Sequence, residues 1–518
     1  MHRYYVVVND PQYKDEVFDQ LVNKEGNQFI PNREVDCVND HPASEYNGEF
    51  VLTDEEAERL RDDPRIWDVH RDPLELGAVI KPFAVLPGSY SKDTTGIVAT
   101  ENNWGLARCI ARSEPFGSNT TLTNFTYTLD GAGVDIIFLD TGILKYHPEF
   151  AKNPDGTGGS RVVDIDWARF GIMTSNPGTS WVGDLDGHGT NVASIAAGIT
   201  NGWAKKANIY AINIIDITNN PNTYTDALSA LQTVRAFHNA KTSNKFGWKQ
   251  PTVVNNSWGY SQSYIAMTGT NYQGTMHPAS GPNPIYGQVP SQGDVLANAT
   301  HGIRVTAIES EILSCQNAGI IFVGAAGNDS MKIDVTTGAD YNNYWIDSTR
   351  NKFYYHRGST PGATPGVICV AAMSQAIPEH KIGFSSTGPR VDVVAPGNYI
   401  MGGYINSSYI FNAVADPRSS VSTSSATTFY LNKISGTSQA TPQVVGVVAC
   451  LMQARPFYNQ TMVNQWVQQN STANILNETY YGPTTSTVYL NYASLQGGTN
   501  AVLYQPFNGS NPTTISTS

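Results

Sequence analysis

Three short segments of this chain each carry a side chain that can take part in nucleophilic catalysis. An apolar run at 134–139 ends in Asp140. His188 lies between two glycines, and Ser438 opens an apolar run that continues to about residue 451. A serine hydroxyl becomes an effective nucleophile when a histidine takes its proton and a carboxylate orients that histidine. The three segments therefore predict a catalytic triad of Asp140, His188 and Ser438.

Each segment also has an ordinary structural explanation. Asp140 is compatible with a simple turn after a strand, and Ser438 with a plain helix cap. In the catalytic interpretation, backbone donors hold the acid ionised at the end of a buried strand, and the flanking glycines leave the His188 imidazole exposed. A helix N-terminus favours negative charge near Ser438. The order Asp, His, Ser is one of the chain orders in which such triads occur, and it favours catalysis.

The segments that must position these residues alternate between short apolar strands and helices. Continuous apolar strands separated by helices predict an α/β fold, in which helices cover both faces of a parallel sheet. Such sheets place their chemistry at the carboxyl ends of the strands. The expected strands are 134–139, 209–214, 252–256, 320–325 and 367–372, and the expected helices are 190–197, 225–239, 303–317 and 442–454.

Residues 1–75 have a different composition, rich in Asp, Glu, Lys and Arg. They predict a small α+β unit with helices on one face of an antiparallel sheet. Thr53 followed by Glu56 predicts a capping box at the start of the second helix. The expected strands are 4–8, 34–38, 49–52 and 66–70, and the expected helices are 14–22 and 54–61.

A linker containing Pro, Gly and Ser follows this unit, and polar stretches interrupt the α/β part. The stretches 260–300, 329–362 and 401–432 are rich in Asn, Ser, Thr, Gly and Tyr, and they predict surface insertions. We therefore expect four parts, which are an N-terminal domain (1–78), a linker (79–100), the α/β domain (101–490) and a polar tail (491–518).

The overall composition limits the classes of function. Of the 518 residues 40% are apolar and 15% charged, and the net charge of −12 argues against a nucleic-acid partner, whose phosphates need a basic surface. No apolar run reaches the roughly 18 residues that a membrane-spanning helix needs, so no membrane partner is expected. The N-terminus lacks the apolar region of a signal peptide, so we expect synthesis in a cytoplasm, or secretion if a signal has been removed. The five cysteines show no C-x-x-C spacing and are expected to be free, buried thiols; the alternative is a single disulfide, whereas a disulfide framework is not expected.

Several motifs resemble those of subtilases, the subtilisin-like serine proteases, and especially their proteinase K branch. Asn-Trp-Gly-Leu-Ala-Arg at 103–108 is similar to the mature N-terminus of that branch. The Asp, His and Ser motifs of the family are matched by Leu-Asp-Thr-Gly-Ile at 139–143 with His-Pro-Glu-Phe at 147–150, by Gly-His-Gly-Thr at 187–190 and by Gly-Thr-Ser-x-Ala-Thr-Pro at 436–442. The resemblance covers nearly all of 1–490. It implies a subtilisin-like fold, a ferredoxin-like N-terminal domain and peptide hydrolysis through an acyl-enzyme.

The resemblance also implies the residues around the nucleophile. Asn328, at the end of Gly-Ala-Ala-Gly-Asn, is expected to donate its amide to the oxyanion beside the Ser438 backbone N–H. Two backbone segments are expected to form the walls of the primary specificity pocket, and the first also pairs with extended substrate. These substrate-binding residues are Ser257, Trp258 and Gly259 on one side, and Ala325, Ala326 and Gly327 on the other. Because the walls are small and uncharged, we expect cleavage after apolar or aromatic residues.

No cofactor is expected for the chemistry, but the resemblance implies a structural calcium ion. Two backbone carbonyls and one carboxylate, at Pro365, Val367 and Asp392, align with a calcium site of the proteinase K type. Oxygen ligands suit Ca²⁺. A structural loop aspartate explains Asp392 equally well.

Three residues near the motifs depart from the family pattern. Asn191 and Gln443 replace histidines, and Gln439 replaces a methionine. None of the three transfers a proton in the expected mechanism, so we expect altered packing and unchanged chemistry.

The N-terminal domain also has a counterpart in the resembling family. Residues 50–69 are similar to the inhibitory propeptide, an intramolecular chaperone that caps the active site. The resemblance implies that this domain is an intramolecular inhibitor, with the chain passing the nucleophile near Ala78. The match at 103–108 favours a mature start nearer residue 100. The alternative is an α+β accessory domain unrelated to inhibition.

The expected function is a serine endopeptidase that hydrolyses polypeptides and processes its own N-terminal domain. The alternative from another class is a structural or assembly component, for example of a viral particle, that retains a protease fold. Association with a particle or into an oligomer would fit the Asn/Ser/Thr-rich insertions and the low-charge tail. An esterase is disfavoured because Gly-Thr-Ser-Gln-Ala at 436–440 replaces the G-x-S-x-G elbow.

Overall fold

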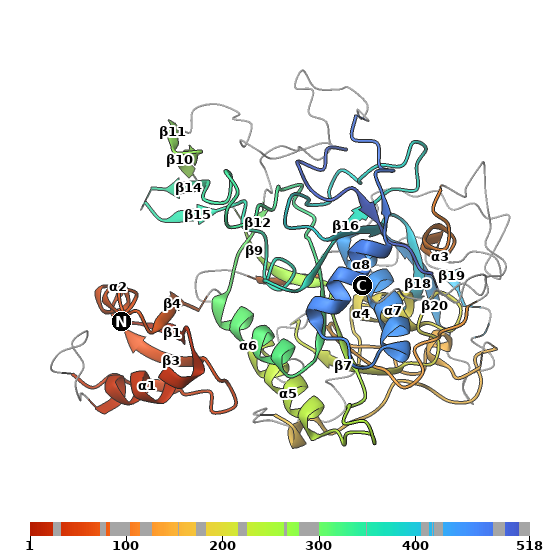
Figure 1. Cartoon of the computed structure of the whole chain (residues 1–518), viewed down its shortest axis with the longest axis horizontal. Coiled ribbons are helices and arrows are strands. Elements are labelled where there is room, and N and C mark those ends of the chain that lie inside the picture. The colour runs from red at the N-terminus through yellow and green to blue at the C-terminus, as the bar shows by residue number, and fades with distance from the viewer. Residues whose placement is uncertain are drawn as a thin grey trace.

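A small N-terminal sheet lies beside a larger α/β part (Figure 1). The computed structural model describes residues 1–23, 33–72, 79–82, 104–113, 127–153, 155–171, 183–215, 225–263, 267–278, 300–348, 350–405, 414–416, 418, 428–479 and 493–506. Ala78, most of the expected linker, much of the stretch 401–432 and half of the expected tail lie outside these residues.

The N-terminal part forms the predicted antiparallel sheet with two helices, and the order of its strands is β2-β3-β1-β4. Phe50 of the sheet packs with Phe18 of the first helix and Leu60 of the second in one apolar core. The second helix begins with the predicted capping box, in which Thr53 and Glu56 exchange hydrogen bonds. The elements are β1 (His2–Val8), η1 (Pro11–Tyr13), α1 (Lys14–Asn23), β2 (Cys37–Asn39), β3 (Asn47–Leu52), α2 (Asp54–Leu60) and β4 (Ile66–Arg71).

The α/β part is built on a sheet of eight strands in the order β21-β22-β17-β16-β13-β8-β6-β7. All neighbouring pairs are parallel except β21 with β22, so the predicted parallel sheet is confirmed, with a short antiparallel edge. The strands are β6 (Asp135–Asp140), β7 (Asn208–Asn213), β8 (Thr252–Asn256), β13 (Ile321–Ala325), β16 (Ile368–Met373), β17 (Val393–Pro396), β21 (Thr472–Ala473) and β22 (Ala501–Val502).

Alternate residues of β6 face opposite layers of helices. Ile136 and Phe138 belong to an apolar cluster with residues of α4, α7 and α8, whereas Ile137 and Leu139 belong to a second cluster with residues of α5 and α6. Burial on both faces explains why the strand is an uninterrupted apolar run. The helices are α3 (Trp104–Cys109), η3 (Pro148–Phe150), η4 (Trp167–Arg169), α4 (His188–Ala197), α5 (Ala227–Ala240), α6 (Thr306–Asn317), α7 (Thr437–Ala454) and α8 (Gln460–Asn470).

The polar stretches that we expected to be surface insertions contain strands of small antiparallel sheets. One sheet has the order β11-β10-β14-β15, a second β12-β9-β5 and a third β18-β20-β19. Most of these strands are short, and several pair with segments remote in sequence, as β5 does with β9 and β10 with β14, so no local apolar periodicity predicts the sheets. Their bounds are β5 (Val79–Pro82), β9 (Trp258–Ser263), β10 (Met267–Tyr272), β11 (Thr275–Pro278), β12 (Thr300–Gly302), β14 (Tyr344–Asp347), β15 (Lys352–Tyr354), β18 (Ile400–Tyr404), β19 (Val414–Ala415) and β20 (Tyr430–Ile434).

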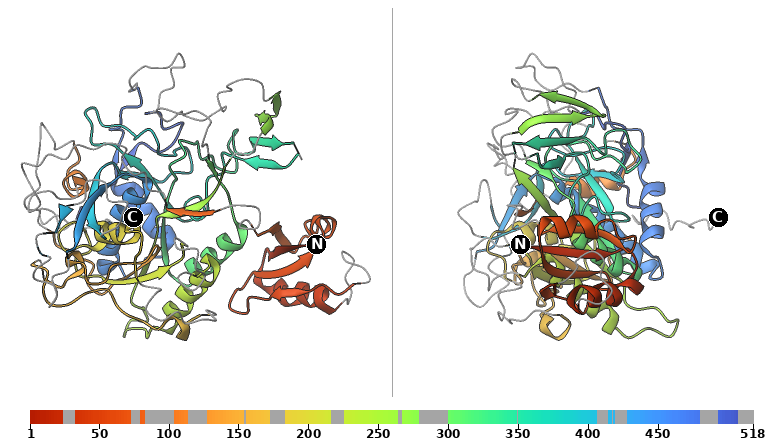
Figure 2. Two further views of the ribbon diagram at one scale, coloured as in Figure 1. Left: turned by 180° about the vertical axis from the view of Figure 1, so that it is seen from behind. Right: turned by 90° about the vertical axis from the view of Figure 1, so that its left-hand side faces the viewer.

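The N-terminal sheet docks on the first turn of α6, and the views of Figure 2 show the two side by side. Asn47 is fully buried there; its Nδ2 donates to the Ala307 carbonyl (3.0 Å) and its Oδ1 accepts from the Ser310 hydroxyl (2.9 Å). His70 Nε2 accepts the Ala307 N–H (3.3 Å). Since α6 has no side-chain cap of its own, His70 satisfies an amide that a helix N-terminus leaves without an intrahelical partner.

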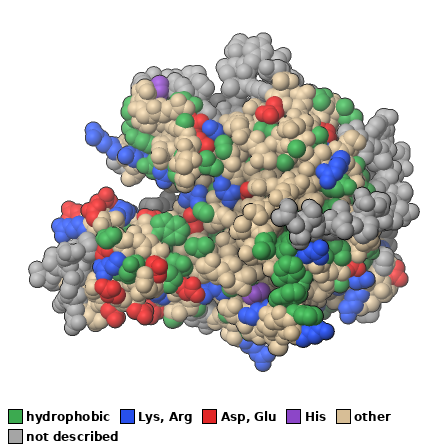
Figure 3. Space-filling model, in the orientation of Figure 1, with side chains coloured by type: hydrophobic (Ala, Val, Ile, Leu, Met, Phe, Trp, Pro, Cys, Tyr) green, Lys and Arg blue, Asp and Glu red, His purple; other side chains and the backbone are tan. Residues whose placement is uncertain are grey.

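The surface reflects the difference in composition between the two parts. Charged side chains gather on the N-terminal part, whereas the α/β face in the same view is largely uncharged (Figure 3). Among the described helices none is long and apolar enough to span a bilayer. The cysteines are all unpaired, as expected, but Cys37 is exposed and only the other four are buried.

Asn47→Ala should loosen the N-terminal sheet from α6, because the substitution removes two buried hydrogen bonds across the contact, to the Ala307 carbonyl and from the Ser310 hydroxyl. We expect a loss of about 1–3 kcal/mol in the unfolding free energy of the N-terminal part, measured by urea titration. The matched control is Asn9→Ala, which removes an exposed bond to the Pro64 carbonyl within the N-terminal part. Equal losses in the two variants would contradict the docking role of Asn47.

Candidate active site

Asp140 is the last residue of β6, at the carboxyl end of the sheet where parallel strands place their chemistry. The side chain is fully buried, and its Oδ1 accepts the Thr141 N–H (2.8 Å) and the His188 Nδ1 proton (2.7 Å). The expected backbone donor for the acid is therefore present. The carboxylate also fixes the tautomer of His188, since an Nδ1–H bonded to Asp140 leaves Nε2 free to accept a proton.

His188 is the first residue of α4, two residues earlier than the predicted start of that helix. The imidazole is only 2% exposed, so the expectation that the flanking glycines leave it exposed is wrong. The glycines instead allow close packing, because a Cβ on Gly189 would lie 2.1 Å from the Gly142 carbonyl oxygen. Burial lowers the pKa of His188, but the charge and hydrogen bond of Asp140 more than offset this and raise it above the ordinary 6.5.

Sequence reasoning missed Asp184, which joins the His188 loop to the Asp140 loop. This buried carboxylate accepts the Gly187 N–H (2.8 Å), the Thr190 N–H (2.9 Å) and the Thr141 hydroxyl (3.0 Å). Burial raises its pKa to about 6, although these hydrogen bonds act to lower it. The sequence does contain a signal for Asp184, which is an acid four residues before a histidine flanked by glycines. Such an acid can accept hydrogen bonds from the backbone N–H groups in the first turn of the following helix.

Ser438 is the second residue of α7, which begins five residues before the expected start at 442. The side chain is buried, and its Oγ donates to the Ser257 carbonyl (2.8 Å), while the Ser257 Oγ donates to the Ser438 carbonyl (2.9 Å). His188 Nε2 is also buried and has no hydrogen-bond partner in the described parts of the chain. A rotation about the Cα–Cβ bond of Ser438 must therefore precede donation to Nε2, which is common before substrate binds.

Asn328 follows β13 and is tied to the start of α7. Its Oδ1 accepts both the N–H and the hydroxyl of Thr437 (2.9 Å each), so Nδ2 is the end of the amide left to bind other groups. The Thr437 hydroxyl in turn accepts the Gly327 N–H (3.2 Å). Gly327 has a φ of +103°, which favours glycine, and this conformation turns the chain out of the strand into Asn328.

The expected substrate-binding segments lie on two sides of Ser438. The first segment begins at Ser257, whose carbonyl is bonded to Ser438, and continues into β9 with Trp258 and Gly259. The second segment runs from the end of β13 into Asn328 and contains Ala325, Ala326 and Gly327. Trp258 packs its ring in the apolar core, so only its backbone is available for pairing. The described residues 79–82 form β5, which pairs antiparallel with β9 and places Pro82 opposite Trp258 and Val79 opposite Ser261.

The three departures from the family pattern form buried hydrogen bonds near the site. Gln439, which follows Ser438, donates to Asn191 Oδ1 (3.3 Å), one turn along α4 from His188. Gln443 accepts the indole N–H of Trp203 (2.8 Å). Two of the departures thus bond to one another across α4 and α7, which agrees with altered packing.

The expected calcium ligands already have a cationic partner. Arg390 donates to the Val367 carbonyl (2.7 Å) and to the Asp392 carboxylate (2.8 Å). It also donates to the Thr364 carbonyl (2.5 Å), whereas Pro365 is exposed. Among the described residues no group of three or more His, Cys, Asp or Glu side chains could hold a metal. The oxygen set therefore does not fit Ca²⁺ in this arrangement, because a guanidinium takes the positions that the ion needs.

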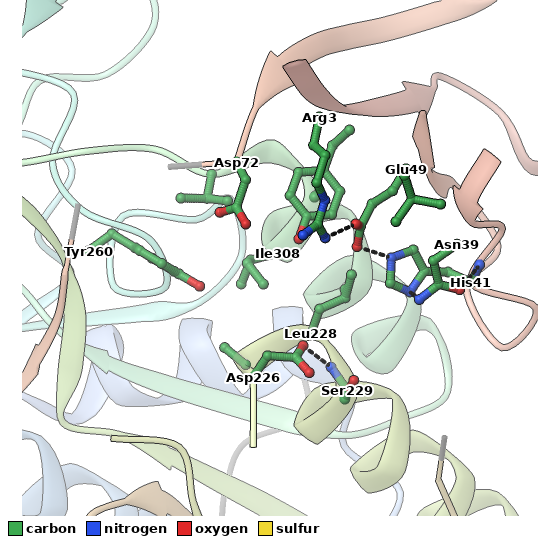
Figure 4. A pocket seen from close by; sticks show the side chains of 15 residues that line it. Arg3, Asn39, His41, Glu49, Asp72, Asp226, Leu228, Ser229, Tyr260 and Ile308 are labelled. Carbon is green, nitrogen blue, oxygen red and sulfur yellow. Dashed lines mark hydrogen bonds and ion pairs between the residues drawn. The ribbon is translucent and has the colours of Figure 1, made fainter. Parts of the chain in front are cut away.

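A cavity of about 370 Å³ lies where the N-terminal sheet meets the α/β part (Figure 4). None of the triad residues lines it. Glu49 at its edge accepts from Arg3 and His41, and Tyr260 of β9 lies across from them. The cavity thus belongs to the contact between the two parts, and Tyr260 is the residue of β9 that lines it.

Comparison with known proteins agrees with this geometry. Residues 131–490 match the Subtilase family, Peptidase_S8. The extracellular serine proteinase of Thermus sp. (strain Rt41A) is 26% identical over 457 residues, which are 88% of this chain and 74% of that protein. The subtilisin-like serine protease Cur l 4.0101 of Cochliobolus lunatus is 26% identical over 79% of this chain and 58% of its own length, and the alkaline serine exoprotease A of Vibrio alginolyticus is 24% identical over 92% and 65%.

Solved structures also match, with lower identities. A cold-adapted subtilisin-like serine proteinase is 20% identical with a TM-score of 0.45, covering 78% of this chain and 98% of that one. Fervidolysin from Fervidobacterium pennivorans, a keratinolytic enzyme related to subtilisin, is 18% identical with a TM-score of 0.49, covering 99% of this chain and 61% of that one. The family match spans well over half of the residues, and the chain belongs to the subtilase family of serine endopeptidases.

Proposed function

We propose that Ser438 is the nucleophile of this peptidase, His188 its general base and Asp140 the residue that orients the base. The observation that carries the proposal is the buried Asp140–His188 hydrogen bond, with Nε2 free to accept a proton and Ser438 on the adjoining helix end. The substrates are polypeptides, as for the family, and the hydrolysis needs no cofactor. The alternative of an inert structural component has no support among the relatives, which are named as proteases.

The reaction then proceeds in two stages. Ser438 Oγ attacks the scissile carbonyl while its proton passes to His188 Nε2, and the negative charge of Asp140 stabilises the imidazolium. Asn328 Nδ2 and the Ser438 N–H donate to the oxyanion. His188 next protonates the leaving amine, and a water molecule attacks the acyl-enzyme by the same route, which regenerates Ser438.

We further propose that the N-terminal part is an intramolecular inhibitor and that the chain cuts itself after Phe83. β5 lies along the edge of β9, where extended substrate is expected to pair. Pro82 lies opposite Trp258, the first residue of β9. The residue that follows Pro82 in the sequence is Phe83, and the residue that precedes Trp258 is Ser257, which is bonded to Ser438. Phe83 also has the aromatic side chain expected at the primary pocket.

This proposed register differs from the expectation that the chain passes the nucleophile near Ala78. Val79 lies opposite Ser261, four residues along the chain from Ser257. In the proposed register the cleavage point comes five residues after Ala78. Ala78 itself lies outside the described residues, and the expectation that the chain passes the nucleophile there stays a prediction. A mature start near residue 100, synthesis in a cytoplasm and association with a particle or oligomer stay predictions.

Ser438→Ala and His188→Ala should each abolish hydrolysis of an unstructured polypeptide such as casein. Without the hydroxyl no acyl-enzyme forms, and without the imidazole the hydroxyl keeps its proton. Tyr146→Ala, at an exposed position, serves as the control and should retain activity. Hydrolysis by purified Ser438→Ala at the wild-type rate would reject the assignment.

Asn328→Ala should mainly lower kcat, because the amide acts on the oxyanion more than on bound substrate. Removing one such donor is expected to cost about 10²–10³ in kcat. Steady-state kinetics with a chromogenic peptide separate kcat from KM. A change confined to KM would contradict the proposed role of Asn328.

Wild-type protein should acquire Ala84 as a new N-terminus, whereas Ser438→Ala should stay full length. Intact mass and N-terminal sequencing of the two proteins, purified in parallel, report this directly. The separated fragment 1–83 should then inhibit the remaining chain in trans at micromolar concentration. A new N-terminus at Val79, or a folded fragment without inhibitory effect, would refute the proposed register or the inhibitory role, respectively.

A further inference from the structure

Arg390 sits at the centre of an oxygen-rich turn that resembles a metal-binding loop. Its Nη2 donates to the carbonyls of Thr364 (2.5 Å) and Val367 (2.7 Å), and its Nε donates to the Ala363 carbonyl (3.2 Å). Nη1 donates to the Asp392 carboxylate (2.8 Å). Three carbonyls and a carboxylate converging on one point form the ligand set that a hard cation prefers.

Both carboxylate oxygens of Asp392 have further donors. Oδ2 also accepts the Cys369 N–H (2.8 Å), and Oδ1 accepts from Gln468 Nε2 (3.0 Å). The Arg390 and Asp392 side chains are only 15% and 12% exposed. A calcium ion needs these same oxygens at about 2.3–2.6 Å, where it would also meet the charge of the guanidinium.

We infer that Arg390 replaces a structural calcium ion, so that this turn is held by an internal cation. The planar fork suits the task because it presents several N–H donors in fixed directions, whereas a lysine would present one flexible point charge. The group is always charged, and it occupies its ligands at any concentration of free metal. The turn at 363–367 is therefore stable without divalent cations.

The turn lies against the proposed specificity pocket, and this part of the inference rests on the proposed function. Gly362 packs so closely on Ala325 that a Cβ would lie 2.0 Å from the Ala325 carbonyl oxygen. On the other side, the Tyr260 N–H of β9 donates to the Thr360 carbonyl (3.1 Å), and the Ser359 hydroxyl donates to the Tyr260 carbonyl (2.8 Å). Arg390 thus positions a segment that connects the two predicted walls.

Terbium luminescence and thermal melting of the full-length protein test the replacement directly. We use Ser438→Ala as the background, because it cannot digest itself during the measurement. We compare this protein with its Asp392→Asn variant. We expect the two to give the same Tb³⁺ signal, and the same response of the melting temperature to EDTA and to millimolar CaCl₂. A Ca²⁺-induced rise in melting temperature that Asp392→Asn abolishes would overturn the inference. This result is independent of peptidase activity, so it stays distinct from a failure of the proposed function.

Arg390→Ala in the same background should expose the oxygen set to metal. We expect a melting temperature lower by a few degrees and a partial recovery with CaCl₂, which Arg390→Ala/Asp392→Asn should lack. Arg65→Ala, which removes an arginine paired with Asp63 in the N-terminal sheet, is the matched control and should gain no response to Ca²⁺. Arg390→Ala that folds and shows neither loss nor recovery would contradict the role of the guanidinium. If that variant does not fold, the Asp392 comparison alone decides.

Discussion

The hydrogen bond between Asp140 and His188 is the interaction on which the rest of the site depends. It forms in a buried setting, where a charge–dipole interaction is strong and an unpaired carboxylate would be costly. The apolar strand β6 positions Asp140, and the first turn of α4 positions His188. Because both elements are packed on both sides, neither side chain can move far from the other. The parallel sheet and α4 therefore hold His188 Nδ1 and Asp140 Oδ1 2.7 Å apart.

The sequence predicted those parts of the site that local patterns determine. An apolar run before Asp140, glycines around His188 and a helical run after Ser438 each describe one element and its boundary. Contacts between elements remote in sequence leave no local signal. For this reason the bonds of Asp184, the strand β5 on β9 and the guanidinium of Arg390 emerged only from the structure. The predicted exposure of His188 failed because the glycines beside it serve packing.

Irregular segments around the sheet share a common means of stabilisation. Carbonyls in turns need donors when they are buried, and long cationic side chains supply them. Arg161, Lys205, Lys381 and Arg390 each donate to two or more backbone carbonyls. Lys381 is fully buried, and burial lowers its pKa to about 7. The loop that Lys381 braces also holds Gly327, because the Ser386 N–H donates to the Gly327 carbonyl (2.9 Å), so the segment that leads into Asn328 depends on this lysine indirectly.

The central claim is that Ser438 is a nucleophile activated by the buried Asp140–His188 pair. Mass-spectrometric mapping of the adduct formed with a fluorophosphonate probe tests it most directly, because the probe reacts only with an activated serine. We predict a single adduct on the peptide that contains Ser438, and its loss in His188→Ala although the serine is still present. An adduct on another serine, or equal labelling of Ser438 in His188→Ala, would contradict the account.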